Sequence, residues 1–143
     1  MELTKKDLVD INNLLSQLSE NANPLNFDQL AEIIKQKNFY IIAVAVRVPA
    51  TQQIIGMGSI IFVQTLMGLK ALIEDIIVDK EHRGQKLGER IVGALIEFAR
   101  TKNVKYIELT SKPARKVANK LYEKFGFQKR KTNVYRLEVN PRP

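Results

Sequence analysis

The chain has 143 residues, about the length of one domain, and contains no cysteine, no tryptophan and a single histidine. The absence of cysteine excludes disulfides, thiolate-bound zinc, iron–sulfur clusters and an acyl-thioester on the protein, and one histidine excludes multi-histidine metal sites, so no metal is expected. With Lys+Arg 23 against Asp+Glu 15, the net charge of +8 predicts affinity for a polyanion: nucleic acid, an anionic membrane or a phosphate-rich small molecule.

The beginning of the chain and its apolar runs indicate a soluble protein. Met1–Lys6 carries charges of both signs, unlike a signal peptide, and the longest apolar runs, such as Ile41–Val46, are too short to span a bilayer. We therefore expect a cytoplasmic protein with no membrane partner, folded as a single domain over residues 1–143.

Two helices are predicted first. Thr4 and Asp7 have the spacing of a capping box, and apolar residues at helical spacing extend the first helix to about Glu20. Asn21–Asn26 interrupts the pattern, and a second helix follows from about Phe27 to near Lys37.

Three strands should come next. Phe39–Val48, Ile54–Val63 and Ala71–Val78 are rich in β-branched and aromatic residues, and Pro49–Gln53 and a loop through Met67 and Gly68 separate them. This order predicts an antiparallel meander.

The last third of the chain alternates between helix and strand. A helix is expected from Leu87 to about Lys102, a short strand at Tyr106–Leu109, a helix opened by Pro113 and capped by Gly126, and a closing strand at Thr132–Val139. The apolar face of the later helix should consist of Ala114, Val117, Ala118, Leu121 and Phe125. The fold class is thus α/β with a mixed sheet, in which βαβ-type units follow the meander.

The loop Arg83–Gly88 joins a β-branched strand to a helix. Free N–H groups at a helix start bind anions, Gly84 lets the backbone approach a ligand closely, and Arg83 adds a cation. The alternative is a tight strand–helix turn with no ligand. The glycine order fits neither a Walker loop nor a dinucleotide fingerprint.

Tyr122 lies beside the apolar face of the later helix, within Asn119–Phe127. It is either a packed core tyrosine or a proton donor at a site.

Together the two stretches, about 35 residues apart, resemble the GNAT superfamily of acetyl-coenzyme A-dependent N-acetyltransferases. Leu121–Phe127 matches that family's Leu-Tyr-Glu-Lys-x-Gly-Phe run. The loop matches at Arg83 and Gly88 but has Lys86 where the family usually has glycine. We expect Lys86 to have helical φ and ψ and to add positive charge. The family's usual first strand has almost no room in Met1–Leu3.

The resemblance implies a single GNAT domain in which acetyl-CoA lies between a splayed pair of strands. It implies direct attack of an amine on the thioester, with Tyr122 as the general acid. The cofactor-binding residues that it implies are Ile76, Ile77, Val78, Arg83, Gly84, Gln85, Lys86, Leu87, Gly88, Arg115 and Asn119.

The base is less directly indicated. Glu74 is the candidate and Asp75 the reserve, and strand alternation would let only one of them face the cleft. The alternative for the pair is a strand-edge salt bridge or a bulge-stabilising carboxylate. His82 is expected to be exposed and non-catalytic.

The acceptor amine is open. Glu74-Asp75 on its strand, the loop and the Tyr122 run resemble glucosamine-6-phosphate N-acetyltransferases, whereas Leu109–Arg115 and Asn133–Arg136 resemble uncharacterised bacterial GNAT members. Alternative acceptors are another small amine or a protein amine. A different alternative is that the protein binds acetyl-CoA without turnover. As family members often dimerise, a homodimer is a further possibility.

A nucleic-acid-binding module is the rival from another class. Such a module should interleave basic and aromatic residues on an exposed face. It is disfavoured because Tyr40, Tyr106 and Tyr135 lie within apolar strand patterns, so no nucleic acid partner is expected.

Overall fold

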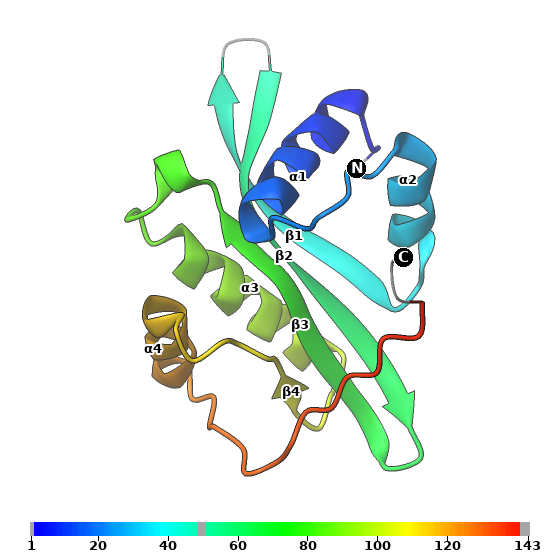
Figure 1. The fold of residues 1–143 in the computed structure, drawn as a ribbon, viewed down its shortest axis with the longest axis vertical. Coiled ribbons are helices and arrows are strands. Elements are labelled where there is room, and N and C mark those ends of the chain that lie inside the picture. The colour runs from blue at the N-terminus through cyan, green and yellow to red at the C-terminus, as the bar shows by residue number, and fades with distance from the viewer. Residues whose placement is uncertain (1, 49–50, 141–143) are drawn as a thin grey trace. The chain divides into compact units, whose positions relative to one another are not determined.

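The computed structural model describes residues 2–48 and 51–140 (Figure 1). Its elements are α1 (Lys5–Leu18), α2 (Phe27–Lys35), β1 (Phe39–Val48), β2 (Thr51–Thr65), β3 (Gly68–Val78), a 3₁₀ turn η1 (Lys80–His82), α3 (Leu87–Thr101), β4 (Ile107–Glu108) and α4 (Lys116–Lys124). They form two compact units, Met1–Thr110 and Ser111–Pro143. Each unit is described by itself.

The four strands form one sheet in the order β1-β2-β3-β4. The pairs β1–β2 and β2–β3 are antiparallel, so the predicted meander is confirmed. The pair β3–β4 is parallel, and α3 provides the crossover between the two strands. In the turn predicted at Pro49–Gln53, the last three residues belong to β2, and Pro49 and Ala50 lie outside the described residues.

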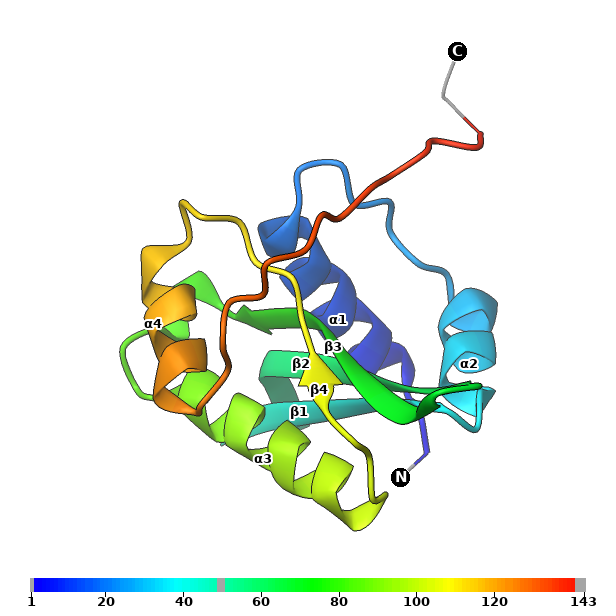
Figure 2. The ribbon, with the colours of Figure 1, turned by 90° about the horizontal axis from the view of Figure 1, so that it is seen from below.

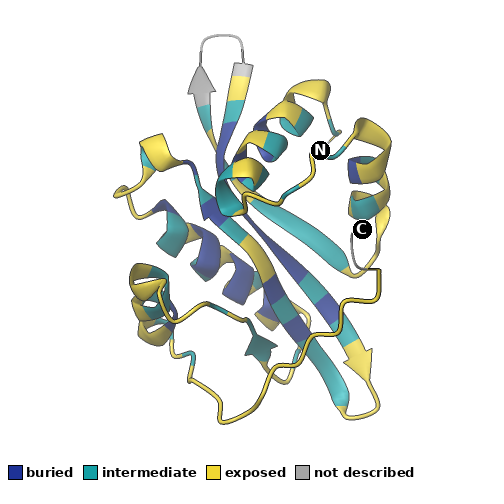
Figure 3. Cartoon of the chain, in the orientation of Figure 1, coloured by how far each residue is buried: buried dark blue, intermediate teal, exposed yellow. Residues whose placement is uncertain are grey.

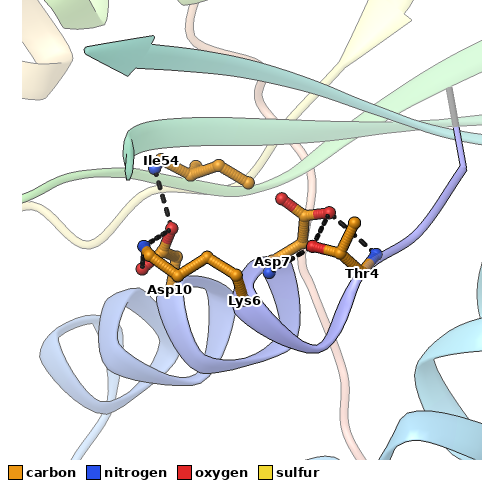
Figure 4. Close-up of polar contacts among 5 residues, drawn as sticks. All are labelled: Thr4, Lys6, Asp7, Asp10 and Ile54. Atoms are coloured by element: carbon orange, nitrogen blue, oxygen red, sulfur yellow. Dashed lines mark hydrogen bonds and ion pairs between the residues drawn. The ribbon is translucent and has the colours of Figure 1, made fainter. Parts of the chain in front are cut away.

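Helix α1 begins where the sequence predicts it and is fixed to the sheet by a buried aspartate (Figure 4). The Thr4–Asp7 capping box is formed in both directions. One turn later, Asp10 is buried, and its Oδ2 accepts a hydrogen bond of 3.0 Å from the backbone N–H of Ile54 while Lys6 pairs with the same carboxylate. The register of β1 against β2 shifts after Val44, next to this contact. Asp10 therefore satisfies an amide at an irregular point of the ladder.

Helices cover both faces of the sheet: α1 and α2 one face, α3 the other (Figure 2). The buried residues form bands along β2, β3 and α3 (Figure 3). Close approach of α3 depends on Gly58, where an added Cβ would lie 2.8 Å from Leu95 and 3.0 Å from Ile91. On the other face, Ile11 and Leu14 of α1 share a core cluster with Ile77 of β3. The helices thus fix both sides of the β3 segment that carries the candidate site.

The second unit begins differently from the prediction. Helix α4 begins at Lys116 rather than at Pro113, so Ala114 lies before it and is exposed. Val117 is 86% exposed, so the assignment of both residues to the apolar face was wrong. The buried residue of α4 is Tyr122. Gly126 does occupy the predicted cap position, with a positive φ of 97°.

The predicted closing strand is also wrong. No strand follows Glu108 in the described part of the chain, and Tyr135 and Leu137 are 87% and 85% exposed. Alternation of polar and apolar residues favours an extended chain, but a strand also needs a hydrogen-bonding neighbour, which a local sequence pattern does not specify.

Candidate active site

The site begins with a β-bulge in β3. Met57 pairs with Ile77 and Ser59 with Glu74, so the single residue Gly58 lies opposite two residues of β3. Asp75 is one of these two, and its φ of 54° is the left-handed conformation that a bulge of this kind requires. Aspartate is among the few residues with a side chain that adopt it readily.

The bulge brings both candidate carboxylates to one face of the sheet. Glu74 stands directly opposite Ser59, and side chains of directly opposed residues share a face. Asp75 is on that face too, because its Oδ2 accepts a hydrogen bond of 2.7 Å from Ser59 Oγ. The prediction that alternation lets only one of them face the cleft was wrong, because the extra residue breaks the alternation.

Their proximity changes the acidity of Glu74. Partial burial raises the pKa of the Glu74 carboxyl above its usual value, and the negative charge of Asp75 raises it further. Asp75 instead accepts the hydrogen bond from Ser59. Glu74 is thus the candidate proton acceptor, with the Asp75 carboxylate held beside it.

Beside the bulge, β3 has an unpaired edge. Its pairing with β4 consists of Ala71 with Ile107 and Leu72 with Glu108, and within residues 2–48 and 51–140 no strand continues it along Ile76–Val78. Unpaired strand edges present N–H and C=O groups to any extended ligand. The short β4 thus leaves this end of the β3 edge without a strand partner among the described residues.

The loop after β3 has two left-handed residues. Gly84 has a φ of 83°, and Lys86 has φ 60° and ψ 23°. The expectation of helical φ and ψ at Lys86 was wrong: this lysine occupies a conformation that suits glycine. Lys86 is the N-cap of α3 and makes no side-chain capping bond, so the first N–H groups of α3 have no cap from it. Gln85 is exposed beside it.

The loop is fixed to the strand and to α1 by side chains. Arg83 Nε donates to the Val78 carbonyl at 3.2 Å. Asp79 is buried, accepts from Gln17 Nε2, and lies 2.9 Å from His82 Nδ1. These two hydrogen bonds, Gln17 first, lower the pKa of Asp79. His82 is therefore partly buried and paired, contrary to expectation.

Sequence reasoning missed Gln17, Asp79 and Ser59. Gln17 is 62 residues from Asp79 along the chain, and no motif links them. For Ser59, the only signal was its place on a strand next to Gly58, which suggests a bulge or a close approach.

In the second unit, Tyr122 is held by the end of α4. Phe127 N–H donates to the Tyr122 carbonyl and Gly126 N–H to that of Glu123, which is the Schellman pattern. The Phe127 ring packs edge-on against the Tyr122 ring with centroids 6.0 Å apart. The glycine and the phenylalanine of the motif thus set the position of the tyrosine.

Tyr122 is 7% exposed. Burial raises the pKa of this hydroxyl above 10.0, and the nearby positive charge of Arg115 partly offsets the effect. A phenol with a raised pKa keeps its proton at neutral pH and can donate it to a stronger base.

Two further predicted cofactor residues lie at the start of α4. Arg115 is exposed and is the N-cap of the helix. The Asn119 side-chain amide donates to the Lys112 carbonyl at 3.1 Å, so part of its hydrogen-bonding capacity stabilises the turn before α4.

Among the described residues, no group of three or more potential metal ligands gathers, and no described helix is both long and apolar enough to cross a membrane.

These features coincide with a family match that extends over most of the chain. Residues 8–127 match the Acetyltransferase (GNAT) family. The chain belongs to this family. As a GNAT acetyltransferase it has an α/β fold with a mixed four-stranded sheet, and the family uses acetyl-CoA as its co-substrate.

Solved structures of GNAT acetyltransferases share the fold. A Trypanosoma brucei acetyltransferase is 26% identical, with a TM-score of 0.80 and coverage of 96% of each chain. The Arabidopsis thaliana glucosamine-6-phosphate N-acetyltransferase is 22% identical, with a TM-score of 0.74 over 96% of this GNAT chain and 95% of that one. An aminoglycoside acetyltransferase from an uncultured soil metagenomic sample is 17% identical, with a TM-score of 0.78. The match covers 97% of this chain and 93% of that one. The comparison with curated proteins finds no match.

Proposed function

We propose that this protein transfers the acetyl group of acetyl-CoA to a primary amine by direct attack, in a single domain over residues 1–143. The observation that carries the proposal is the β3 bulge, which gathers Glu74 and Asp75 on one face next to an unpaired strand edge. A proton acceptor and unpaired backbone donors are the two things that aminolysis of a thioester requires.

Glu74 would act as the base. A substrate ammonium has a pKa near 10, so it must lose a proton before its nitrogen can attack. The raised pKa of Glu74 brings this carboxylate closer to the operating pH, which favours proton transfer. Asp75, held by Ser59, would keep the ammonium in place.

The bond changes balance as follows. Glu74 takes the first proton of the ammonium, the C–N bond forms, and the C–S bond breaks. Tyr122 donates its proton to the departing thiolate, and the new amide nitrogen releases its second proton to solvent. Solvent then restores Glu74 and Tyr122, so each turnover releases one proton.

The remaining groups would bind the co-substrate, which supplies an activated acyl carbonyl when bound. The edge of Ile76–Val78 can pair with an extended amide-containing chain. The uncapped start of α3, with Arg83, Gly84 and Gln85 before it and Leu87 and Gly88 in its first turn, suits a pyrophosphate. Lys86 and Arg115 supply positive charge, and Asn119 retains its side-chain oxygen as an acceptor.

The acceptor that the loop and Tyr122 motifs favour is an amino-sugar phosphate such as glucosamine 6-phosphate, for which the positive charge of the chain is suitable. The likeness to the plant enzyme supports this acceptor only at the level of the fold.

The test replaces the glycine in the first turn of α3. Gly88→Glu places a bulky anion at the proposed pyrophosphate site and should abolish acetyl-CoA binding, measured by calorimetry. Ala94→Glu, an exposed position on the same helix, should leave binding intact. Equal affinity in the two variants would mean that this loop does not bind the co-substrate.

A further inference from the structure

A cavity of about 70 Å³ lies beside the bulge, within the first unit. Its wall consists of apolar side chains from α1, α2, β1 and β2, among them Leu15 and Ile33. The polar side chains in its lining are those of Ser59 and Asp75, which are bonded to each other. The cavity is therefore an apolar chamber with one carboxylate.

The position of that carboxylate determines how a ligand would enter. Asp75 both lines the cavity and is exposed, so it marks the place where the cavity meets solvent. Glu74, on the same face, is its neighbour at this entrance. A cation at the entrance would have two negative charges nearby, and an apolar group attached to it would extend inward.

The lining also disfavours a phosphorylated acceptor. No lysine or arginine is among the described residues of the wall. A phosphate placed there would lose its hydration without gaining a counter-ion, which is costly in an apolar setting.

The size sets the length of the apolar group. Since one water molecule needs about 10–15 Å³ of such space, a cavity of 70 Å³ could hold about five to seven. A chain of four or five carbons would occupy this volume.

We propose that this cavity is the acceptor pocket and that its ligand is a primary amine on a short apolar chain, with the ammonium at Asp75 and the chain in the cavity. This inference rests on the proposed function and refines it. It names a substrate class other than the amino-sugar phosphate that the sequence motifs favour.

The test measures binding of four probes to the full chain by calorimetry, with and without acetyl-CoA. Pentylamine carries both features, ethylamine lacks most of the apolar chain, 1-pentanol lacks the charge, and glucosamine 6-phosphate represents the phosphorylated class. Because each buried methylene raises affinity about fourfold, pentylamine should bind at least tenfold tighter than ethylamine. It should also bind at least tenfold tighter than 1-pentanol. Equal affinities for pentylamine and ethylamine, or tightest binding of glucosamine 6-phosphate, would overturn the inference.

Two matched pairs of variants localise the site. Asp75→Asn keeps a residue that tolerates the left-handed conformation and should weaken pentylamine binding about tenfold, while Asp28→Asn, an exposed aspartate of α2, should not. Ile33→Phe fills the cavity and should weaken pentylamine more than ethylamine, while Ile34→Phe, on the exposed side of the same helix, should affect neither. If Ile33→Phe leaves pentylamine binding unchanged, the chain does not enter this cavity.

An assay of acetyl-CoA consumption with the same probes separates the two proposals. Binding of pentylamine without consumption of acetyl-CoA supports the pocket and contradicts the proposed transfer. Acetylation of glucosamine 6-phosphate in preference to pentylamine supports the transfer and contradicts the pocket.

Discussion

Glu74 and Asp75 are adjacent residues whose environments give them different tasks. The hydroxyl of Ser59 donates a hydrogen bond to Asp75, whereas partial burial and then the negative charge of Asp75 raise the pKa of Glu74. A carboxyl whose pKa is raised by its surroundings is a common feature of acid–base chemistry. In this chain the arrangement depends on one inserted residue in β3.

The pH dependence of kcat/KM should report this coupling. Glu74 must be unprotonated to accept a proton, so the rate should fall as the pH falls through its raised pKa. Asp75→Asn removes the neighbouring negative charge, which lowers the pKa of Glu74 and should move the acidic limb to lower pH. Glu74→Gln should abolish that limb. If the acidic limb of the kcat/KM profile stays at the same pH in Asp75→Asn, the coupling is contradicted, even if the maximum value of kcat/KM changes.

Tyr122→Phe removes the proposed proton donor while retaining the ring that packs on Phe127. We expect kcat to fall about a hundredfold, which is the lower end of the rate enhancement that general acid catalysis usually provides. The Kd for acetyl-CoA should not change. Tyr106→Phe, at a half-exposed tyrosine of the first unit, should leave kcat intact. A wild-type rate in Tyr122→Phe would rule out the acid role.

Lys86→Gly should stabilise the protein. The left-handed conformation costs a lysine ~1–2 kcal/mol, and the extra freedom of glycine in the unfolded chain offsets ~0.5–1 kcal/mol of the gain. The net stabilisation in urea unfolding should be about 0.7 kcal/mol, the midpoint of a range of ~0–1.5 kcal/mol. Gln85→Gly, where φ is not positive, should destabilise instead. Destabilisation by both changes would show that Lys86 makes contacts that outweigh its strain.

At the level of elements, a buried carboxylate adds a polar contact to the apolar packing of α1 on the sheet. Asp10 accepts the Ile54 amide where the β1–β2 ladder is irregular (Figure 4). Two turns later, the same helix supplies Gln17, whose side-chain amide donates to Asp79 after β3. The helix thus supports both the acceptor face and the loop before α3.

Asp10→Ala should therefore destabilise the fold more than an ordinary surface change. It leaves a buried N–H without an acceptor, at a cost of about 1–3 kcal/mol. Asp28→Ala removes an exposed first-turn aspartate of α2 and should lower the free energy of unfolding by only about 0.3 kcal/mol. Comparison of their urea midpoints checks the prediction, and equal midpoints would contradict it.

The elements that the sequence predicts well are those with local signals. The Thr4–Asp7 cap, the meander and Gly126 all depend on residues within a few positions of one another. The bulge at Asp75 and the network from Gln17 to Asp79 depend on tertiary partners. Strand alternation therefore predicted the wrong face for one carboxylate. The polar loop around His82 likewise predicted exposure, whereas Asp79 pairs with it.

For the whole molecule, the charge is concentrated in one unit. Ser111–Pro143 contains ten Lys and Arg against two Asp and Glu, a net +8, whereas residues 1–110 contain thirteen of each. Two of the three tyrosines that argued against a nucleic acid partner do not lie in apolar strands: Tyr106 and Tyr135 are exposed and outside the described strands. A binding assay must therefore distinguish coenzyme A from a polyanion.

The most direct measurement is thermal melting of the protein with acetyl-CoA, with coenzyme A and with a short DNA oligomer. A ligand that binds only the folded state stabilises it by about 2.7 kcal/mol at a hundredfold excess over Kd. We predict a rise in Tm with acetyl-CoA and with coenzyme A that the oligomer does not reproduce. A rise with the oligomer and none with acetyl-CoA would contradict the proposal that this site transfers acetyl groups.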